Sequence, residues 1–218
     1  MRMQSPIQQS ARRAPRRAAK PPRRQQAERS ATTRRDLLDA AVGCLGEVGY
    51  QQLTMELVST KAKVSRGAVQ HHFGSRDDLI LAVVEDIGAA LVIEEAVLTT
   101  TSLPQQLDGT IDHDWKVLSS PQFAAVMQIW LAERGNADLF PKIQKTVTAV
   151  EKRLDRRWTQ AFAGSGLNPT DIVSLRHVVL SALRGLCLRS IFHGNTASNA
   201  SELAMLKLMA SEIIRKKT

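Results

Sequence analysis

From Thr33 onward, apolar side chains recur every three or four residues, the spacing that places them on one face of an α-helix. The first such segment ends at Gly49, and glycine is typical of the position just after a helix. No alternating apolar and polar run is long enough for a β-strand, so the pattern predicts an all-α protein. The apolar positions of this first helix are Leu37, Leu38, Ala41, Cys44, Leu45 and Val48.

Two short helices with very little chain between them are predicted next. Thr54 is a suitable N-cap for the second helix, and Ser65 for a third helix that ends near His72. Between the second helix and Ser65 stand only Lys63 and Val64. Helices joined by so tight a connection must cross steeply, which is the geometry of a helix-turn-helix.

Ser75 opens a long fourth helix, with Asp77 and Asp78 in its first turn, where the helix dipole favours negative charge. Its apolar stripe comprises Leu79, Ile80, Val83, Ile87 and Leu91. Farther on, cap residues, prolines and acidic first turns mark more helix starts, at Ser120-Pro121, Asn168-Pro169 and Asn199. The further helices are predicted at about 104–117, 121–134, 138–163, 169–193 and 199–216.

The third helix has one apolar side and one polar side. Val69 and Phe73 are four residues apart and are predicted to point inward. Arginine can contact guanine, and glutamine adenine, through two hydrogen bonds in a major groove. On most helices such residues form a solvated face, but their place on the second helix of the pair favours DNA recognition. The residues left on the open side are Arg66, Gly67, Gln70 and His71.

A set of residues with family-like spacing runs without a gap through 37–79. It comprises Leu37, Leu38, Ala40, Ala41, Gly49, Tyr50, Thr54, Val58, Ala62, Val64, Ser65, Gly67, His72, Phe73 and Leu79. This stretch resembles the N-terminal DNA-binding domain of the TetR family of bacterial transcription regulators. The resemblance implies a ligand-responsive repressor that binds a palindromic operator as a homodimer and responds to a small-molecule inducer.

The resemblance also implies which residues contact DNA. Ser65, Arg66, Gly67, Ala68, Gln70 and His71 would face the major groove, while Thr54, His72 and Arg76 would approach phosphates. The chain departs from the family at Lys63, where glycine is usual, at Gln70, where tyrosine is common, and at Ala68, where threonine is frequent. Lys63 would carry a side chain where a left-handed backbone is often needed, at a cost of about 1 kcal/mol.

The charge is unevenly distributed along the chain. Most of the net charge of +9 comes from residues 1–30, whose one acid is Glu28 and which are too poor in apolar residues to fold alone, so we expect a disordered basic tail. We then expect the helix-turn-helix domain at 31–78 and a helical effector-binding and dimerisation domain at 79–218. The basic residues of the tail are Arg2, Arg12, Arg13, Arg16, Arg17, Lys20, Arg23, Arg24 and Arg29.

Two sites are predicted in the C-terminal helices: an inducer cavity and a dimer interface. Aromatic and apolar residues there are more often core than pocket, but the resemblance implies an inducer cavity. Its candidate lining is Trp115, Phe123, Met127, Trp130, Leu131, Trp158, Phe162 and His177.

The helix from Pro169 is apolar nearly all round, so it must be buried on more than one side, and pairing with the last helix favours a four-helix dimer interface. Its candidates are Ile172, Leu175, Val179, Leu183, Leu186, Leu203, Leu206 and Ile213.

Other kinds of chemistry are disfavoured. His71 and His72 lie about 100° apart around a helix, so we expect no metal there, and no motif indicates a cofactor or an enzyme. No apolar stretch has the length of a membrane span, and two distant cysteines, Cys44 and Cys187, favour reduced buried thiols in a cytoplasmic protein that joins the nucleoid when bound to DNA. The main alternative is a nonspecific nucleic-acid binder driven by the tail, with the helices only a dimerisation module.

Overall fold

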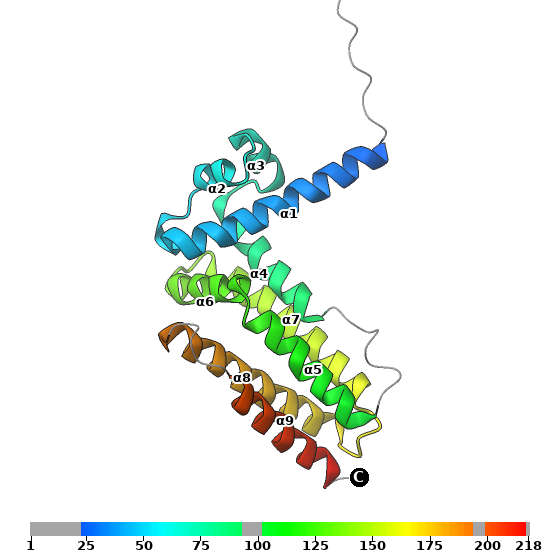
Figure 1. Ribbon diagram of the computed structural model, residues 1–218. Helices are drawn as coiled ribbons and strands as arrows, with labels where there is room; N and C mark the ends of the chain where they lie inside the picture. Colours follow the sequence, from blue (N-terminus) through cyan, green and yellow to red (C-terminus); the bar gives the residue numbers. More distant parts are fainter. Residues whose placement is uncertain (1–22, 93–101, 194–198, 217–218) are drawn as a thin grey trace, which may run out of the picture.

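The computed structural model describes residues 23–92, 102–193 and 199–216, and this part of the chain is helical with no strand (Figure 1). The prediction of an all-α fold is confirmed. In chain order the elements are α1 (Arg23–Val48), the short 3-10 turn η1 (Tyr50–Gln52), α2 (Met55–Lys61), α3 (Arg66–His72), α4 (Arg76–Val92), α5 (Leu103–Leu118), α6 (Pro121–Glu133), α7 (Phe140–Ala161), α8 (Pro169–His193) and α9 (Ala200–Arg215).

Helix α1 begins earlier than expected. Residues 23–30, which we placed in a disordered tail, form its first turns, so that expectation is wrong for this part. The physical reason is that no proline interrupts the residues directly after Pro22, and these are good helix formers such as Gln, Ala, Glu and Arg. Residues 1–22 lie outside the described part of the chain.

The helix starts follow the cap residues closely. The hydroxyl oxygens of Thr54, Ser65 and Ser120 accept hydrogen bonds from the backbone N–H three residues on, as expected of N-caps. Asn168 does the same for Asp171. Asn199 is the exception: it stands at the start of α9, but its side chain instead bonds Ser190 and Arg189 of α8, because it is buried between the two helices.

The first three helices share one apolar core. Leu37, Ala41, Val58 and Val69 come from α1, α2 and α3, and each is fully buried. Burying one such side chain contributes about 1.5–3 kcal/mol, so these contacts hold two helices of only seven residues that would not be stable alone. The inward side of α3 is therefore stabilised by packing in this shared core.

Helix α4 joins the two parts of the molecule (Figure 1). It packs against α1, where Arg35 forms an ion pair with Asp86 in the second half of α4 at 3.0 Å, and it packs closely along α7. Gly88 allows this approach because a Cβ there would collide with Val150. The expected domain boundary between residues 78 and 79 falls inside this continuous helix, which both parts share.

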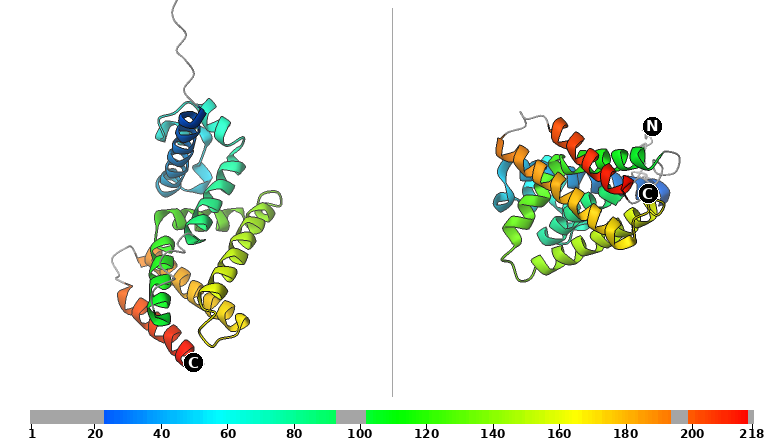
Figure 2. Two further views of the ribbon diagram at one scale, coloured as in Figure 1. Left: turned by 90° about the vertical axis from the view of Figure 1, so that its right-hand side faces the viewer. Right: turned by 90° about the horizontal axis from the view of Figure 1, so that it is seen from below.

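The remaining helices form the larger part, in which α6 packs against α1 and η1. Helices α8 and α9 run side by side at its far end, as both figures show (Figure 2). Cys44 and Cys187 are free and buried, as expected, and burial raises the pKa of both thiols.

The connection between α2 and α3 has the left-handed residue that the sequence suggested. Lys63 has a φ of 56°, its N–H donates to the carbonyl of Thr60, and the Val64 N–H donates to Ser59. This is the hydrogen-bond pattern of a Schellman motif, in which glycine is the usual residue at the left-handed position. The lysine therefore carries backbone strain that glycine would not.

We expect Lys63→Gly to raise the free energy of unfolding by about 1 kcal/mol and the Tm by roughly 2–4 °C, because the strain is removed. The matched control is Lys145→Gly at an exposed helical lysine of α7, which should lower the free energy of unfolding by about 1 kcal/mol. Urea unfolding followed by circular dichroism measures both. The same sign for the two variants would contradict the interpretation.

Candidate nucleic-acid interface

The outer side of α3 is open, as the spacing predicted. Arg66, Gln70 and His71 are exposed, whereas Val69 is fully buried and Phe73 is almost so. Ala68 is partly buried, so only part of its methyl group reaches the surface. A short helix supported from behind and polar in front has the shape required to enter a major groove.

Gly67 lies on this open face with space around it. A Cβ built at this position would meet nothing closer than the Ser65 hydroxyl at 3.9 Å. Packing within the chain therefore does not require a glycine. Its missing side chain brings the backbone of α3 closer to whatever approaches from outside.

Two capping hydroxyls border the same face. The oxygen of Ser65 accepts from the Ala68 N–H at 3.1 Å, and the oxygen of Thr54 accepts from the Leu57 N–H at 3.1 Å. A hydroxyl that accepts in this way still has its own proton to donate. Both hydroxyls are exposed and lie at helix N-termini, where the dipole favours an anion such as phosphate.

Arg76 has a different environment from the one expected. Its guanidinium donates to the carbonyls of Leu53 and Tyr50, at 2.9 Å each, and to the Tyr50 hydroxyl at 3.1 Å, and it also stacks on the tyrosine ring. Burial and a hydrogen bond with Glu133 of α6 raise the pKa of Tyr50 to about 12. We therefore correct the phosphate assignment of Arg76: these contacts within the chain engage its guanidinium and place it between the helix-turn-helix and α6.

His72 is half-buried at the end of α3. Burial, the neighbouring His71 and Arg34 of α1 all lower the pKa of its imidazole. The two histidine rings lie edge to face, with centroids 5.5 Å apart. The described residues contain no group of three or more histidines, cysteines or carboxylates able to hold a metal ion.

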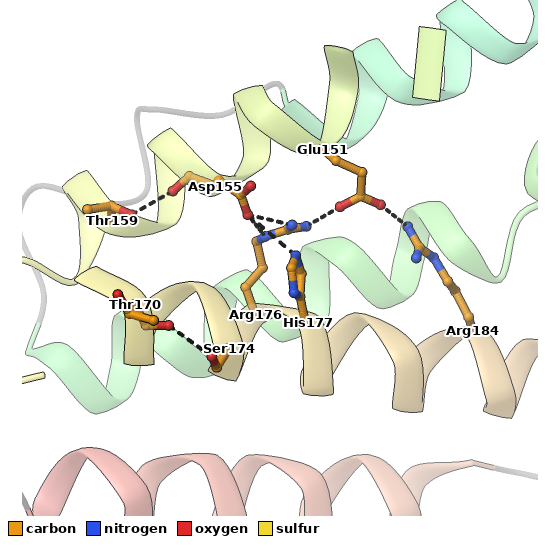
Figure 3. Close-up of polar contacts among 8 residues, drawn as sticks. All are labelled: Glu151, Asp155, Thr159, Thr170, Ser174, Arg176, His177 and Arg184. Atoms are coloured by element: carbon orange, nitrogen blue, oxygen red, sulfur yellow. Dashed lines mark hydrogen bonds and ion pairs between the residues drawn. The ribbon is translucent and has the colours of Figure 1, made fainter. Parts of the chain in front are cut away.

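An ion-pair network joins α7 to α8 in the larger part (Figure 3). The fully buried guanidinium of Arg176 lies 2.7 Å from Glu151 and 2.5 Å from Asp155, while Arg184 contacts Glu151 at 2.8 Å. These arginines keep the pKa of Glu151 below its usual value although burial opposes them. Sequence reasoning missed this network because no local pattern reports a pairing between residues more than twenty positions apart.

The eight expected pocket residues do not gather around one cavity. Trp130 and Leu131 are 41% and 66% exposed, and His177 also lies on the surface, beside Asp155 in Figure 3. Phe123, Trp158 and Phe162 are buried in the core, whereas Trp115 and Met127 are partly buried. The prediction of one pocket lined by all eight residues is therefore wrong, because the apolar residues of α6 occupy more than one face of that helix.

Asp114 of α5 is a buried acid, although its sequence context favours a solvated helix surface. It is 0% exposed, and neither of its carboxylate oxygens has a hydrogen-bond partner in the described part of the chain. Burial raises its pKa to about 7, although Arg157, Arg176 and Arg184 act in the opposite direction. A buried polar group without a partner is rare in proteins and usually has a specific role.

The last turn of α4 is held by side chains next to this acid. Nε2 of His113, from α5, donates to the carbonyl of Ala90 at 3.1 Å, and Arg157 of α7 donates to the carbonyl of Leu91 at 2.6 Å. Arg157 is also the charged residue that acts most strongly on Asp114. The interior of the larger part is thus in direct contact with the helix that carries the helix-turn-helix.

The expected dimer interface is largely wrong in its residues. Ile172, Leu175, Val179, Leu183 and Leu206 are buried within the subunit, and Leu186 and Leu203 are partly buried. The helix periodicity identified the apolar residues but not which of them the subunit covers itself. Of the expected residues only Ile213 is exposed, and it is joined on the outer faces of α8 and α9 by Val178, Met205, Leu208 and Met209.

An N-terminal helix-turn-helix with an exposed second helix, on an otherwise helical chain, defines a DNA-binding transcription regulator. Residues 37–83 match the family model described as bacterial regulatory proteins, tetR family. These residues therefore form a DNA-binding domain of the tetR type, as the resemblance implied. None of the described helices is long and apolar enough to cross a membrane.

Relatives and solved structures agree with this assignment. The chain is 28% identical over 174 residues to the transcriptional regulator CymR of Pseudomonas putida, covering 79% of this chain and 86% of that one. It is 26% identical to the regulator BetI of Serratia proteamaculans, covering 79% and 87%. The fold matches the fatty acid degradation regulator FadR of Bacillus halodurans with a TM-score of 0.66, 14% identity, and coverage of 82% and 94%.

We expect Asp114→Asn to stabilise the protein more at high pH than at low pH. The folded-state pKa of about 7 exceeds the value of about 3.9 in an unfolded chain, so stability due to this group is lost as pH rises between the two. Removing the charge should therefore raise the free energy of unfolding by about 2 kcal/mol more at pH 8 than at pH 5.

Urea unfolding at both pH values measures this effect. The control is Asp112→Asn on the same helix, where the carboxylate is exposed and paired with Lys207 at 2.6 Å. A surface pair contributes roughly 0–1 kcal/mol, so this variant should show little dependence on pH. A gain in Asp114→Asn that is equal at the two pH values would refute the interpretation.

Proposed function

We propose that the protein is a ligand-responsive repressor that binds a two-fold symmetric operator as a homodimer. The observation that carries the proposal is the outer face of α3, which is exposed and polar while its inner face is anchored in the core. Two such helices related by a dimer axis would enter successive major grooves on one side of the DNA. Because the proposed partner is DNA, we expect the protein to act in the cytoplasm and to join the nucleoid when it is bound.

Each residue of the open face has a role that fits its chemistry. Arg66 would donate to O6 and N7 of guanine, and Gln70 would bond N6 and N7 of adenine. The Ala68 methyl offers an apolar contact, while Gly67 lets the backbone approach closely. His71 faces the same groove. Ser65, Thr54 and His72 would approach phosphates, which position the helix without reading sequence.

The partner surface of the dimer is the exposed apolar face of α8 and α9, at the far end of the molecule in Figure 1. Apolar groups gathered in this way usually mark an interface. Gly185 has open space around it on α8, so a helix from a second copy could pack closely there. The apolar residues of this face are Val178, Met205, Leu208, Met209 and Ile213.

The effector response would pass through the end of α4. His113 and Arg157 hold its last carbonyls, so an effector that disturbs these contacts would let α4 tilt and change the spacing of the two α3 helices. Effectors differ among relatives of this fold. The FadR of Bacillus subtilis, 18% identical and with a TM-score of 0.63 over 84% of this chain and 98% of that one, is described in complex with stearoyl-CoA.

Selection of bound fragments from random DNA tests recognition. Wild-type protein should yield two related half-sites about one helical turn apart. Arg66→Ala should relax base preference at one position of each half-site by roughly 1–3 kcal/mol, because one bidentate contact is lost. Arg153→Ala, an exposed arginine of α7, should leave the profile unchanged.

The same selection distinguishes the rival function. A nonspecific binder driven by the basic N-terminal segment would enrich no common sequence, with or without Arg66. Enrichment that is unaltered by Arg66→Ala would remove this residue from the proposed contacts.

We expect Met209→Asp to dissociate the dimer, because a carboxylate would be buried in the apolar face of α9. The association constant should fall at least 100-fold, equivalent to about 2.8 kcal/mol. Sedimentation equilibrium of the full chain measures it. Leu131→Asp is the control, since this residue is equally apolar and 66% exposed on α6, outside the proposed face. A Met209→Asp protein as dimeric as the control would argue against this interface.

A further inference from the structure

The first turns of α1 extend beyond the core without an apolar face. No described side chain of α1 is buried before Leu37. Eight residues of exposed helix, from 25 to 32, span about 12 Å at 1.5 Å per residue. A helix that is polar on all sides gains no stability from packing within the subunit, so contact with a polar partner is the natural use of such an extension.

This extension and the end of α3 line an open groove of about 530 Å³. The lining residues are Gln26, Ala27, Arg29, Ser30 and Thr33 of α1 and His71 and His72 of α3. Among the described residues, no carboxylate lines it. It offers a guanidinium, an amide, a hydroxyl and two imidazoles, a set of donors that suits a phosphate oxygen.

We propose that this groove holds the backbone phosphates of the operator strand on the side of α3 opposite to α2. The inference rests on the proposed function, because it needs α3 to lie in a major groove. A helix in that position has a phosphate strand on each side. Thr54 at the start of α2 faces one strand, and Figure 1 shows the extension of α1 passing α3 on its other side.

The groove therefore lengthens the contact with DNA beyond the helix-turn-helix itself. Arg29 supplies the formal charge, while Ser30 lies beside it on the same face of α1. Thr33 donates its hydroxyl proton to the carbonyl of Arg29 and so is not counted among the donors. Phosphate contacts of this kind add affinity that depends on salt and is indifferent to base sequence.

Two neighbouring substitutions test the position of the groove. Ser30→Glu places a carboxylate in the groove, whereas Ala31→Glu places the same charge on an exposed residue outside its lining. Both variants have the same net charge and introduce the same glutamate into the same turn of α1. On the full chain and the selected operator, Ser30→Glu should weaken binding at least tenfold and Ala31→Glu threefold or less, measured by fluorescence anisotropy at about 0.1 M salt.

A second measurement tests the charge of Arg29. Replacing it with alanine should reduce the slope of log affinity against log salt by about 1, the value for one phosphate contact, while Arg153→Ala leaves the slope unchanged. Hydroxyl-radical footprints should lose protection of the flanking backbone in Ser30→Glu, with base preference retained.

The outcomes separate this inference from the repressor proposal. Equal losses in Ser30→Glu and Ala31→Glu, or an unchanged salt slope in Arg29→Ala, would overturn the groove even if operator selection succeeds. If wild-type protein enriches no sequence, the repressor proposal fails instead. The two glutamate variants compared on random duplex then decide the groove alone, with a tenfold difference supporting it.

Discussion

The burial of Val69 and Phe73 behind α3 is the contact on which the rest of the interface depends. A helix of seven residues is too short to persist in water without tertiary packing. Because these two side chains are anchored in the core shared with α1, the opposite face of α3 points outward. Exposure of Arg66 and Gln70 is therefore a consequence of packing behind the helix.

In the proposed repressor, helix α4 would connect the larger part of the subunit to the helix-turn-helix. Its second half is tied to α1 through Arg35 and Asp86, and one turn farther on its last backbone carbonyls are held by His113 and Arg157. A polar group bonded to a carbonyl can be displaced at modest cost, whereas the close contact of Gly88 with Val150 limits sideways movement along α7. These constraints favour a tilt of the helix over a translation.

The buried polar groups of this protein fall into two kinds. Arg176 is fully buried but faces two carboxylates, so separating α7 from α8 would leave a buried charge without its partners. Asp114 is buried and has no hydrogen-bond partner among the described residues, so it weakens the fold at neutral pH. A cost of this kind persists in proteins where the group serves a purpose other than stability.

The sequence by itself determined the helix order, most helix ends and the open face of α3. These features follow from local rules: side chains such as Ser65 and Thr54 cap the backbone three residues away, and apolar spacing repeats within one helix. Only the tertiary structure decided which apolar faces of α8 and α9 remain exposed, that the guanidinium of Arg76 bonds Tyr50 and Leu53, and that Asp114 is buried. Each depends on contacts between residues far apart in the chain, and periodicity within a helix carries no information about the partner that covers it.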